Sequence, residues 1–165
     1  MTKTTEIKNK YRGFTYQVLA LSGGWRCGYV RIPKKHPLYG LDYTDQIPTT
    51  FNEISNEKVG KRGILSMLCV SKYGSKDRVS VDTLFDVHGG VTFTGNLENK
   101  KSWWIGFDCA HAGDKRDRSI MDDDALNFNK EYGFDNYGVI RTKEYVETEC
   151  KSLIDQIIKW FDRYD

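Results

Sequence analysis

The segment 142–161 constrains the fold most, because its pattern predicts one long amphipathic helix. Thr142 is a suitable N-cap residue, and the carboxylate of Glu144 favours the positive end of the helix dipole. The apolar residues recur at helical spacing and form a single stripe: Tyr145, Val146, Cys150, Leu153, Ile154, Ile157, Trp160 and Phe161. A stripe of this width needs a second layer to pack against.

Short segments with strand-like alternation supply that layer. Residues 14–21 and 25–32 are separated by a glycine-containing break and predict a β-hairpin. Residues 84–93 and 103–109 also predict strands, each with one apolar and one mixed face. We therefore predict an α+β fold, in which a mainly antiparallel sheet of about five to six strands packs one face against the C-terminal amphipathic helix.

The other segments are polar or ambiguous. Residues 1–10 predict a flexible N-terminus, which leaves residues 11–165 as a single α+β domain. Residues 110–140 predict a long polar loop, in which the aspartates at 122–124 are expected to be solvated. Residues 64–70 form a short apolar stretch that fits either a helix or a strand.

Charge and composition narrow the class of partner. The chain has 25 basic and 23 acidic residues and no long basic run, so we expect no DNA or RNA polymer as a partner. It has no apolar run of membrane-spanning length and no apolar signal segment, so we expect no membrane and a cytoplasmic location. The four cysteines form no Cys-x-x-Cys pair, which excludes a zinc ribbon and favours reduced thiols.

All three histidines lie in polar, glycine-containing segments, and we predict that they belong to one site. His88 shares the mixed face of a predicted strand with Asp86, and Asp108 ends the next strand just before His111. We assign His88, His111 and Asp108 as candidate catalytic residues. The candidate ligand-binding residues are His36, Tyr39, Asp42, Gly89, Gly90, Trp104 and Asp114.

Two kinds of chemistry fit these residues. In a metal-free pocket, Trp104 or Tyr39 would stack a base, while imidazoles and backbone amides near the glycines would hold phosphate. Such a pocket needs no cofactor. Alternatively, the histidines at 88 and 111, with Asp108 or Asp114, would bind one divalent metal such as Zn or Mn and activate water.

Each candidate also has a purely structural interpretation. His36 could cap a turn, His88 could satisfy a backbone group at a strand end, and Asp108 could form an Asx-turn. Cys109 is the one thiol close in sequence to an imidazole, that of His111, and so the one candidate nucleophile. The other cysteines are expected to be small core residues.

Four motifs, in order along the chain, resemble a family of small, largely uncharacterised proteins of phages and mobile elements. They are CGYVRIPKKHPLYG at 27–40, VHGGVTF at 87–93, WIGFDCAHAGD at 104–114 and YVETEC at 145–150. The segment 48–80 fits this family poorly. The resemblance implies a phage-type origin, and small phage proteins often counter host defence by capturing or cleaving nucleotide signals.

These observations predict a phage-type accessory protein with a role against host defence. It would bind a small nucleotide-derived ligand in a pocket of histidine, aspartate and aromatic residues, by sequestration or by hydrolysis. One alternative is a metal-dependent hydrolase that uses the histidine and aspartate set described above. Another is a protein inhibitor that binds a host enzyme through its surface. We also leave open a homo-oligomer.

Overall fold

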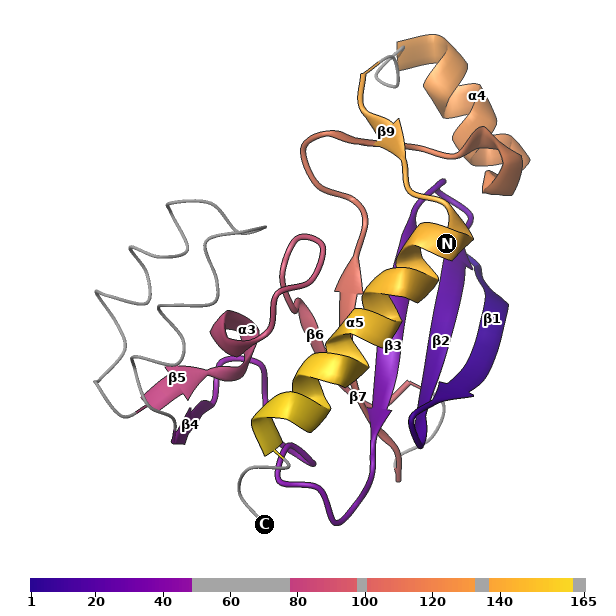
Figure 1. The fold of residues 1–165 in the computed structure, drawn as a ribbon. Coiled ribbons are helices and arrows are strands. Elements are labelled where there is room, and N and C mark those ends of the chain that lie inside the picture. Colours follow the sequence, from indigo (N-terminus) through magenta and orange to yellow (C-terminus); the bar gives the residue numbers. More distant parts are fainter. Residues whose placement is uncertain (49–77, 98–100, 133–136, 162–165) are drawn as a thin grey trace.

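The computed structural model describes residues 1–48, 78–97, 101–132 and 137–161. Five strands form one antiparallel sheet in the order β1-β2-β3-β7-β6, and a long helix, α5, lies across it (Figure 1). These elements are β1 Lys3–Tyr11, β2 Phe14–Leu21, β3 Arg26–Ile32, β6 Phe93–Gly95, β7 Trp103–Asp108 and α5 Lys143–Phe161. The predicted α+β class and the packing of the helix on the sheet are confirmed.

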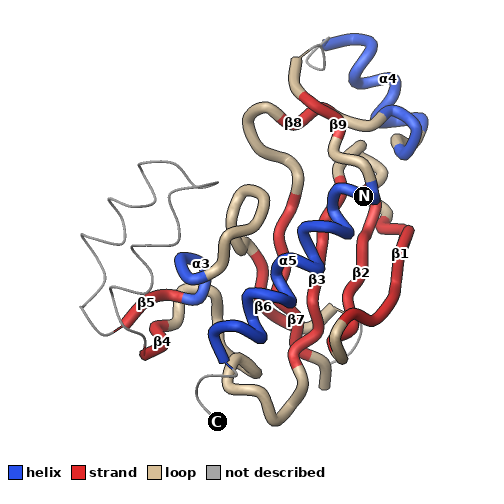
Figure 2. Tube along the Cα trace, viewed as in Figure 1, coloured by secondary structure: helices blue, strands red, loops and turns tan. Residues whose placement is uncertain are grey.

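The shorter elements form two groups at the border of this sheet (Figure 2). In one group, β4 (Gln46–Pro48) pairs with β5 (Arg78–Ser80), and α3 (Val81–Leu84) follows. In the other, two short strands pair in parallel around a 3-10 turn and a helix: β8 Asp114–Lys115, η1 Arg118–Ile120, α4 Asp123–Tyr132 and β9 Val139–Ile140. The apolar stretch at 64–70, with Cys69, lies outside the described residues.

The N-terminal segment is a strand, so the prediction of a flexible end at 1–10 is wrong. β1 pairs with β2 along its length, and a two-residue turn, Arg12-Gly13, joins the two strands. The turn residues have φ angles of 47° and 86°, as in the tight turns that match strand twist. Because β1 is an edge strand of the described sheet, it is polar, and its composition concealed the pairing.

The strand predicted at 84–93 does not form, and only its last residue, Phe93, belongs to a strand, β6. This corrects the prediction for that segment. After α3 the chain follows an irregular path through a tight turn, in which the amide of Gly90 donates to the carbonyl of Val87 at 2.8 Å. Gly89 and Gly90 have φ angles of 67° and 82°, which interrupt an extended chain. Only β6, from Phe93 onward, pairs with β7.

Residues 110–140 contain regular structure rather than one loop. The side chain of Asp122 accepts a hydrogen bond from the amide of Ala125 at 2.8 Å, which is N-cap geometry for α4. Asp123 and Asp124 lie in the first turn of that helix, where negative charge is favourable. The three aspartates are exposed, as expected, but they start a helix, so the expectation of a loop is wrong.

The main core lies between α5 and one face of the sheet. As predicted, Thr142 caps α5: its hydroxyl oxygen accepts from the amide of Tyr145 at 3.2 Å. Ile105 and Phe107 of β7 point toward the helix and belong to this core. The buried apolar stripe of α5 comprises Val146, Cys150, Leu153, Ile154, Ile157, Trp160 and Phe161.

Gly28 allows α5 to approach β3 closely. A Cβ at this position would lie 2.4 Å from Cζ of Phe107 and 2.7 Å from Sγ of Cys150. We expect Gly28→Ala to lower the free energy of unfolding by about 1–3 kcal/mol through overpacking, measured by urea denaturation. Gly23→Ala is the matched control, because a Cβ there would make ordinary contacts, the nearest at 3.4 Å. Equal losses in both variants would contradict this explanation.

The opposite face of the sheet carries a second, smaller cluster, formed by Leu19, Cys27, Tyr29 and Trp104. The side chain of Trp104 is fully buried, and its Nε1 donates to the hydroxyl of Ser102 at 3.1 Å. A ring enclosed in this way cannot stack on a ligand. The ligand-binding role predicted for Trp104 is therefore wrong.

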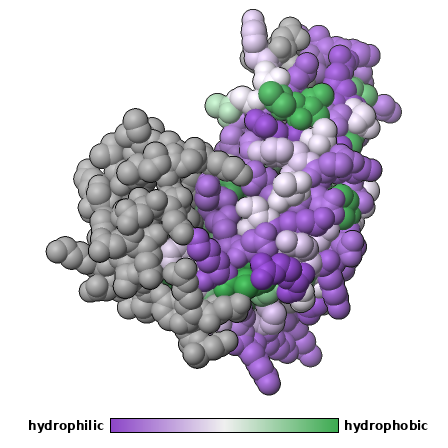
Figure 3. Space-filling view, in the orientation of Figure 1, coloured by the Kyte–Doolittle hydropathy of each residue, from purple (hydrophilic) through white to green (hydrophobic). Residues whose placement is uncertain are grey.

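The outer surface around α5 is mainly hydrophilic, with an apolar patch near β9 (Figure 3). Val139 and Ile140 are exposed in this strand. None of the helices in the described part of the chain combines the length and the apolar character needed to cross a membrane.

Candidate functional site

Four side chains from distant parts of the sequence meet beside the start of α5. Nε2 of His88 lies 2.8 Å from Oδ2 of Asp114, and Nδ1 lies 2.9 Å from the hydroxyl of Tyr145. Nε of Arg141 donates to Oδ1 of Asp114 at 2.8 Å. We call these four side chains the histidine network. They tie the turn at 87–90 and the residues after β7 to α5.

Both ring nitrogens of His88 are engaged in this network. Because the carboxylate of Asp114 can only accept, Nε2 carries a hydrogen and donates it to Oδ2. Nδ1 lies within hydrogen-bond distance of the hydroxyl of Tyr145, whose pKa is raised to about 12 by burial and the nearby charge of Glu149, so that the phenol stays protonated at neutral pH. With both positions satisfied, His88 has no ring nitrogen left for a substrate or a metal.

Asp114 is the centre of the network, with a side chain that is 1% exposed. Burial alone would raise its pKa, but hydrogen bonds from Arg141, His88 and the amide of His111 outweigh burial and lower the pKa of this carboxyl. Asp114 is therefore a carboxylate at neutral pH, compensated by Arg141. Its oxygens face these donors rather than a ligand, which contradicts the ligand-binding role predicted from the sequence.

His111 lies beside the histidine network, with its ring centroid 6.0 Å from that of His88. Its ring packs on Gly89, where a Cβ would come within 2.1 Å of Nε2. Glycine at 89 is thus required by this close approach as well as by its positive φ. Two of the three histidines do meet as predicted, and Gly89 serves their packing. Gly90 closes the adjoining turn.

Asp108 ends β7 and forms the Asx-turn that was one of its two interpretations. Its Oδ1 accepts from the amide of Ala110 at 3.1 Å, and its Oδ2 accepts from the hydroxyl of Thr92 at 3.2 Å. Nε2 of His111 lies 3.1 Å from Oδ1, but the two groups are not aligned for a hydrogen bond. The side chains of Asp108 and His111 are 34% and 37% exposed, respectively, and are more accessible than those of His88 and Asp114.

Cys109 is not an activated nucleophile. Its side chain is buried, and burial together with the charge of Asp114 raises the pKa of the thiol. The thiol therefore stays protonated at neutral pH. Cys27 and Cys150 are also free and buried, as expected for core residues.

His36 lies at the other end of α5. Its ring makes edge contacts with Phe14 and Phe161, at centroid distances of 6.0 and 5.1 Å, and Nδ1 accepts from the amide of Leu38 at 3.1 Å. A helix rise of ~1.5 Å per residue separates Phe161 from Tyr145 by about 24 Å. The prediction that all three histidines share one site is therefore wrong, and His36 closes a turn.

The metal set predicted from His88, His111 and Asp108 is not assembled. Within the described ranges, no group of three His, Cys, Asp or Glu residues could hold a metal ion. The engagement of both His88 nitrogens explains why this ring contributes no ligand. A metal-dependent hydrolase built on these residues is not supported.

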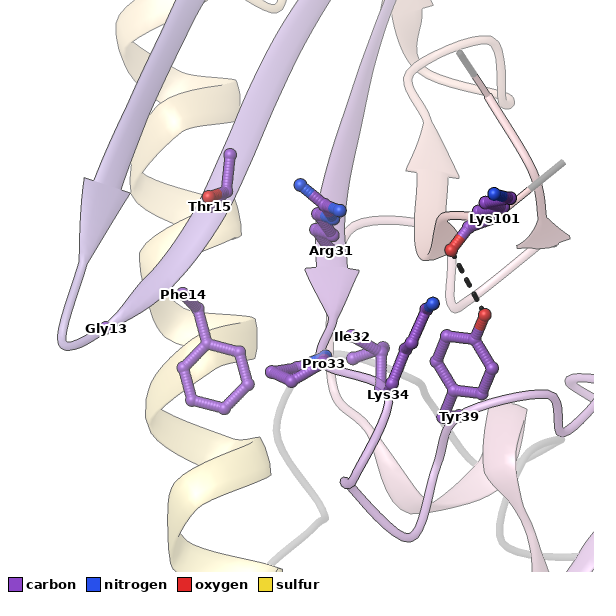
Figure 4. A pocket seen from close by; sticks show the side chains of 9 residues that line it. All are labelled: Gly13, Phe14, Thr15, Arg31, Ile32, Pro33, Lys34, Tyr39 and Lys101. Atoms are coloured by element: carbon purple, nitrogen blue, oxygen red, sulfur yellow. Dashed lines mark hydrogen bonds between the residues drawn. The ribbon is translucent and has the colours of Figure 1, made fainter. Parts of the chain in front are cut away.

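A pocket of about 250 Å³ lies at the far end of β3 from the histidine network (Figure 4). Three cationic residues line it: Arg31 of β3, Lys34 of the following loop, and Lys101, which precedes β7. None of the described residues that line it is acidic. We call it the cationic pocket; the other lining residues are Gly13, Phe14, Thr15, Ile32, Pro33 and Tyr39.

Aromatic rings border the cationic pocket. In Figure 4, Phe14 and Tyr39 lie on either side of Pro33 and Lys34. The hydroxyl of Tyr39 donates to the backbone carbonyl of Lys101 at 3.1 Å, which holds the ring in place. Tyr39 is half-buried, so part of the ring stays accessible. Its position fits the stacking role predicted for it.

The remaining candidate, Asp42, does not line this pocket. It is exposed in a turn of its own, where its Oδ1 accepts from the amide of Thr44 at 3.4 Å and the carboxylate of Asp45 accepts from its amide at 2.8 Å. The ligand-binding role predicted for Asp42 is therefore not supported.

The cationic pocket and the histidine network are separate. In the pairing of β3 with β7, Ile32 is opposite Trp103 near the pocket, and Cys27 is opposite Asp108 near the network. At ~3.4 Å per residue these two levels of the sheet are about 17 Å apart. One small ligand in the pocket cannot reach His88 or the groups around it.

Comparison of the chain with family models, curated proteins and solved structures finds no match. Function must therefore be inferred from the residues themselves. Arg31, Lys34 and Lys101 were missed at the sequence level, since the motif at 27–40 contains the first two but nothing in the sequence links them to Lys101. The one available signal was the Arg-Ile-Pro-Lys string that ends β3, where proline turns the chain and leaves cations on both sides.

Proposed function

We propose that this protein binds a small nucleotide-derived ligand through the cationic pocket. The supporting observation is the lining itself, which combines three cations with an accessible aromatic ring and contains no described acid. Arg31 and Lys34 would hold a phosphate, since guanidinium and ammonium groups bind phosphate oxygens strongly. Tyr39 would stack on the base. A net charge of only +2 suits local recognition of a small anion better than binding of a polymer.

The ligand is captured rather than hydrolysed in this proposal. The described residues that line the pocket include no histidine, carboxylate or thiol to act as a base or nucleophile. The histidine network lies about 17 Å away along the sheet, at ~3.4 Å per residue. A ligand recovered after denaturation of the protein should therefore be chemically unchanged, which chromatography of the released material measures.

Titration calorimetry with adenosine 5′-monophosphate tests the pocket. We expect saturable binding by the wild-type protein and an increase in Kd of about tenfold in Arg31→Gln, the effect of losing one charge-assisted hydrogen bond. Lys35→Gln is the control, because Lys35 is exposed beside Lys34 but does not line the pocket. No saturable binding, or equal weakening by both substitutions, would count against a specific site.

Other predictions from the sequence accompany this proposal without further support. A phage-type origin, a role against host defence and a cytoplasmic location stay predictions from the motifs and composition. Inhibition of a host enzyme through the protein surface, and assembly into a homo-oligomer, stay alternatives. A screen for binding to host proteins would test the first alternative, and the mass of the protein in solution would test the second.

A further inference from the structure

The positive charge of the cationic pocket continues across the sheet onto β1. Lys10 is opposite Thr15, a pocket-lining residue, and Lys8 is opposite Gln17. Directly paired residues point to the same side of a sheet, with Cβ atoms ~5 Å apart. Tyr16, between the two β2 residues, belongs to the core under α5, so both lysines lie on the face away from that helix.

The pocket is small for a complete nucleotide ligand. Its volume of about 250 Å³ is below the ~300–1,000 Å³ that is usual for small-molecule sites. A phosphate held by Arg31 and a base on Tyr39 would fill it. Any further part of the ligand must then lie outside, and Lys10 is the residue directly across the sheet from Thr15, which lines the pocket.

We infer that the ligand is of the dinucleotide class, with one phosphate in the cationic pocket and a second at Lys10. This inference rests on the proposed function of the pocket. Lys10 is exposed, and a lysine in this position binds phosphate as a point charge at little cost in desolvation. The competing explanation is that lysines on an edge strand only prevent pairing with other chains.

Lys3 separates the two explanations. It lies on the same strand, is opposite Leu21, and like Lys10 points away from α5, but at the far end of β1. A role in edge protection applies equally to both lysines. A role in phosphate binding applies only to Lys10.

Calorimetric titration of the full chain with adenosine 5′-monophosphate and with the dinucleotide pApA tests the inference. We expect pApA to bind about fivefold tighter, the gain from one exposed charge pair. Lys10→Gln should remove this difference without changing the Kd of the mononucleotide, and Lys3→Gln should preserve it. Circular dichroism checks that both variants are folded.

The outcomes distinguish the inference from the proposal on which it rests. Equal affinities for the two ligands, or equal effects of the two lysine substitutions, would overturn the dinucleotide class and leave the pocket intact. Absence of binding to either ligand would overturn the proposed function itself. Tighter binding of a ten-residue single-stranded oligonucleotide than of pApA would also overturn the inference, in favour of a polymer.

Discussion

Asp114→Asn is expected to lower the free energy of unfolding by about 3 kcal/mol or more. Oδ2 of Asp114 is within hydrogen-bond distance of both His88 and the amide of His111, and Oδ1 accepts from Arg141. An asparagine nitrogen cannot accept, so at least one of these donors loses its partner, and the charge of Arg141 is no longer compensated. Urea denaturation followed by circular dichroism measures the loss.

Asp124→Asn is the control for this substitution, since Asp124 is exposed in the first turn of α4. Removal of one charge near a helix terminus costs about 0.3–1 kcal/mol. A loss in Asp114→Asn no larger than in Asp124→Asn would mean that the histidine network contributes nothing to stability. The histidine network would then not be what holds the start of α5 in place.

Acid titration adds a second readout of Asp114. Burial opposes ionisation, but the donors around Asp114 lower its pKa in the folded protein, so the unfolded chain holds this proton more tightly. The stabilisation is complete above the unfolded pKa of about 3.9 and is lost as the pH falls through the folded pKa. Wild-type stability should therefore fall more steeply below about pH 4 than that of Asp114→Asn.

The sequence predicted the elements that are richest in buried apolar residues. β2, β3, β7 and α5 match their predicted segments to within one residue at every end, because short apolar runs and a stripe at helical spacing are the clearest patterns in a sequence. β1 was missed for the opposite reason. An edge strand gains its stability from backbone pairing, which leaves no trace in the side-chain pattern.

The alternation in β7 also shows what a pattern leaves undetermined. It correctly separated Ile105 and Phe107 from Trp104 and Asp108. It did not reveal that a second cluster covers Trp104, because side-chain period specifies a side of the sheet and not what packs on it. The contact of His88 with Asp114 depends in the same way on the path of the turn at 87–90, which glycines direct.

Arg26→Met is expected to cost about 3–5 kcal/mol, because it removes the cation that two mostly buried carboxylates share. The Arg26 side chain, 6% exposed, donates from Nε to Glu6 at 2.6 Å and from Nη1 to Asp117 at 2.7 Å. Urea denaturation measures the change. Arg31→Met is the matched control on the same strand, since Arg31 is exposed and its loss should change stability by less than about 0.5 kcal/mol. We call Arg26, Glu6 and Asp117 the Arg26 cluster. Similar losses in both variants would contradict a structural role for this cluster.

The Arg26 cluster and the histidine network should be energetically coupled, because both hold Arg141. Nη1 of Arg26 donates to the carbonyl of Arg141 at 3.1 Å, while the side chain of Arg141 donates to Asp114. Loss of either contact loosens the residues that lead into α5. The second substitution should then lower the free energy of unfolding by less than it does in the wild-type protein. A double-mutant cycle of Arg26→Met with Asp114→Asn should give a coupling energy of about 0.5–3 kcal/mol. Additivity to within about 0.3 kcal/mol would mean that the two networks stabilise β1 and α5 independently.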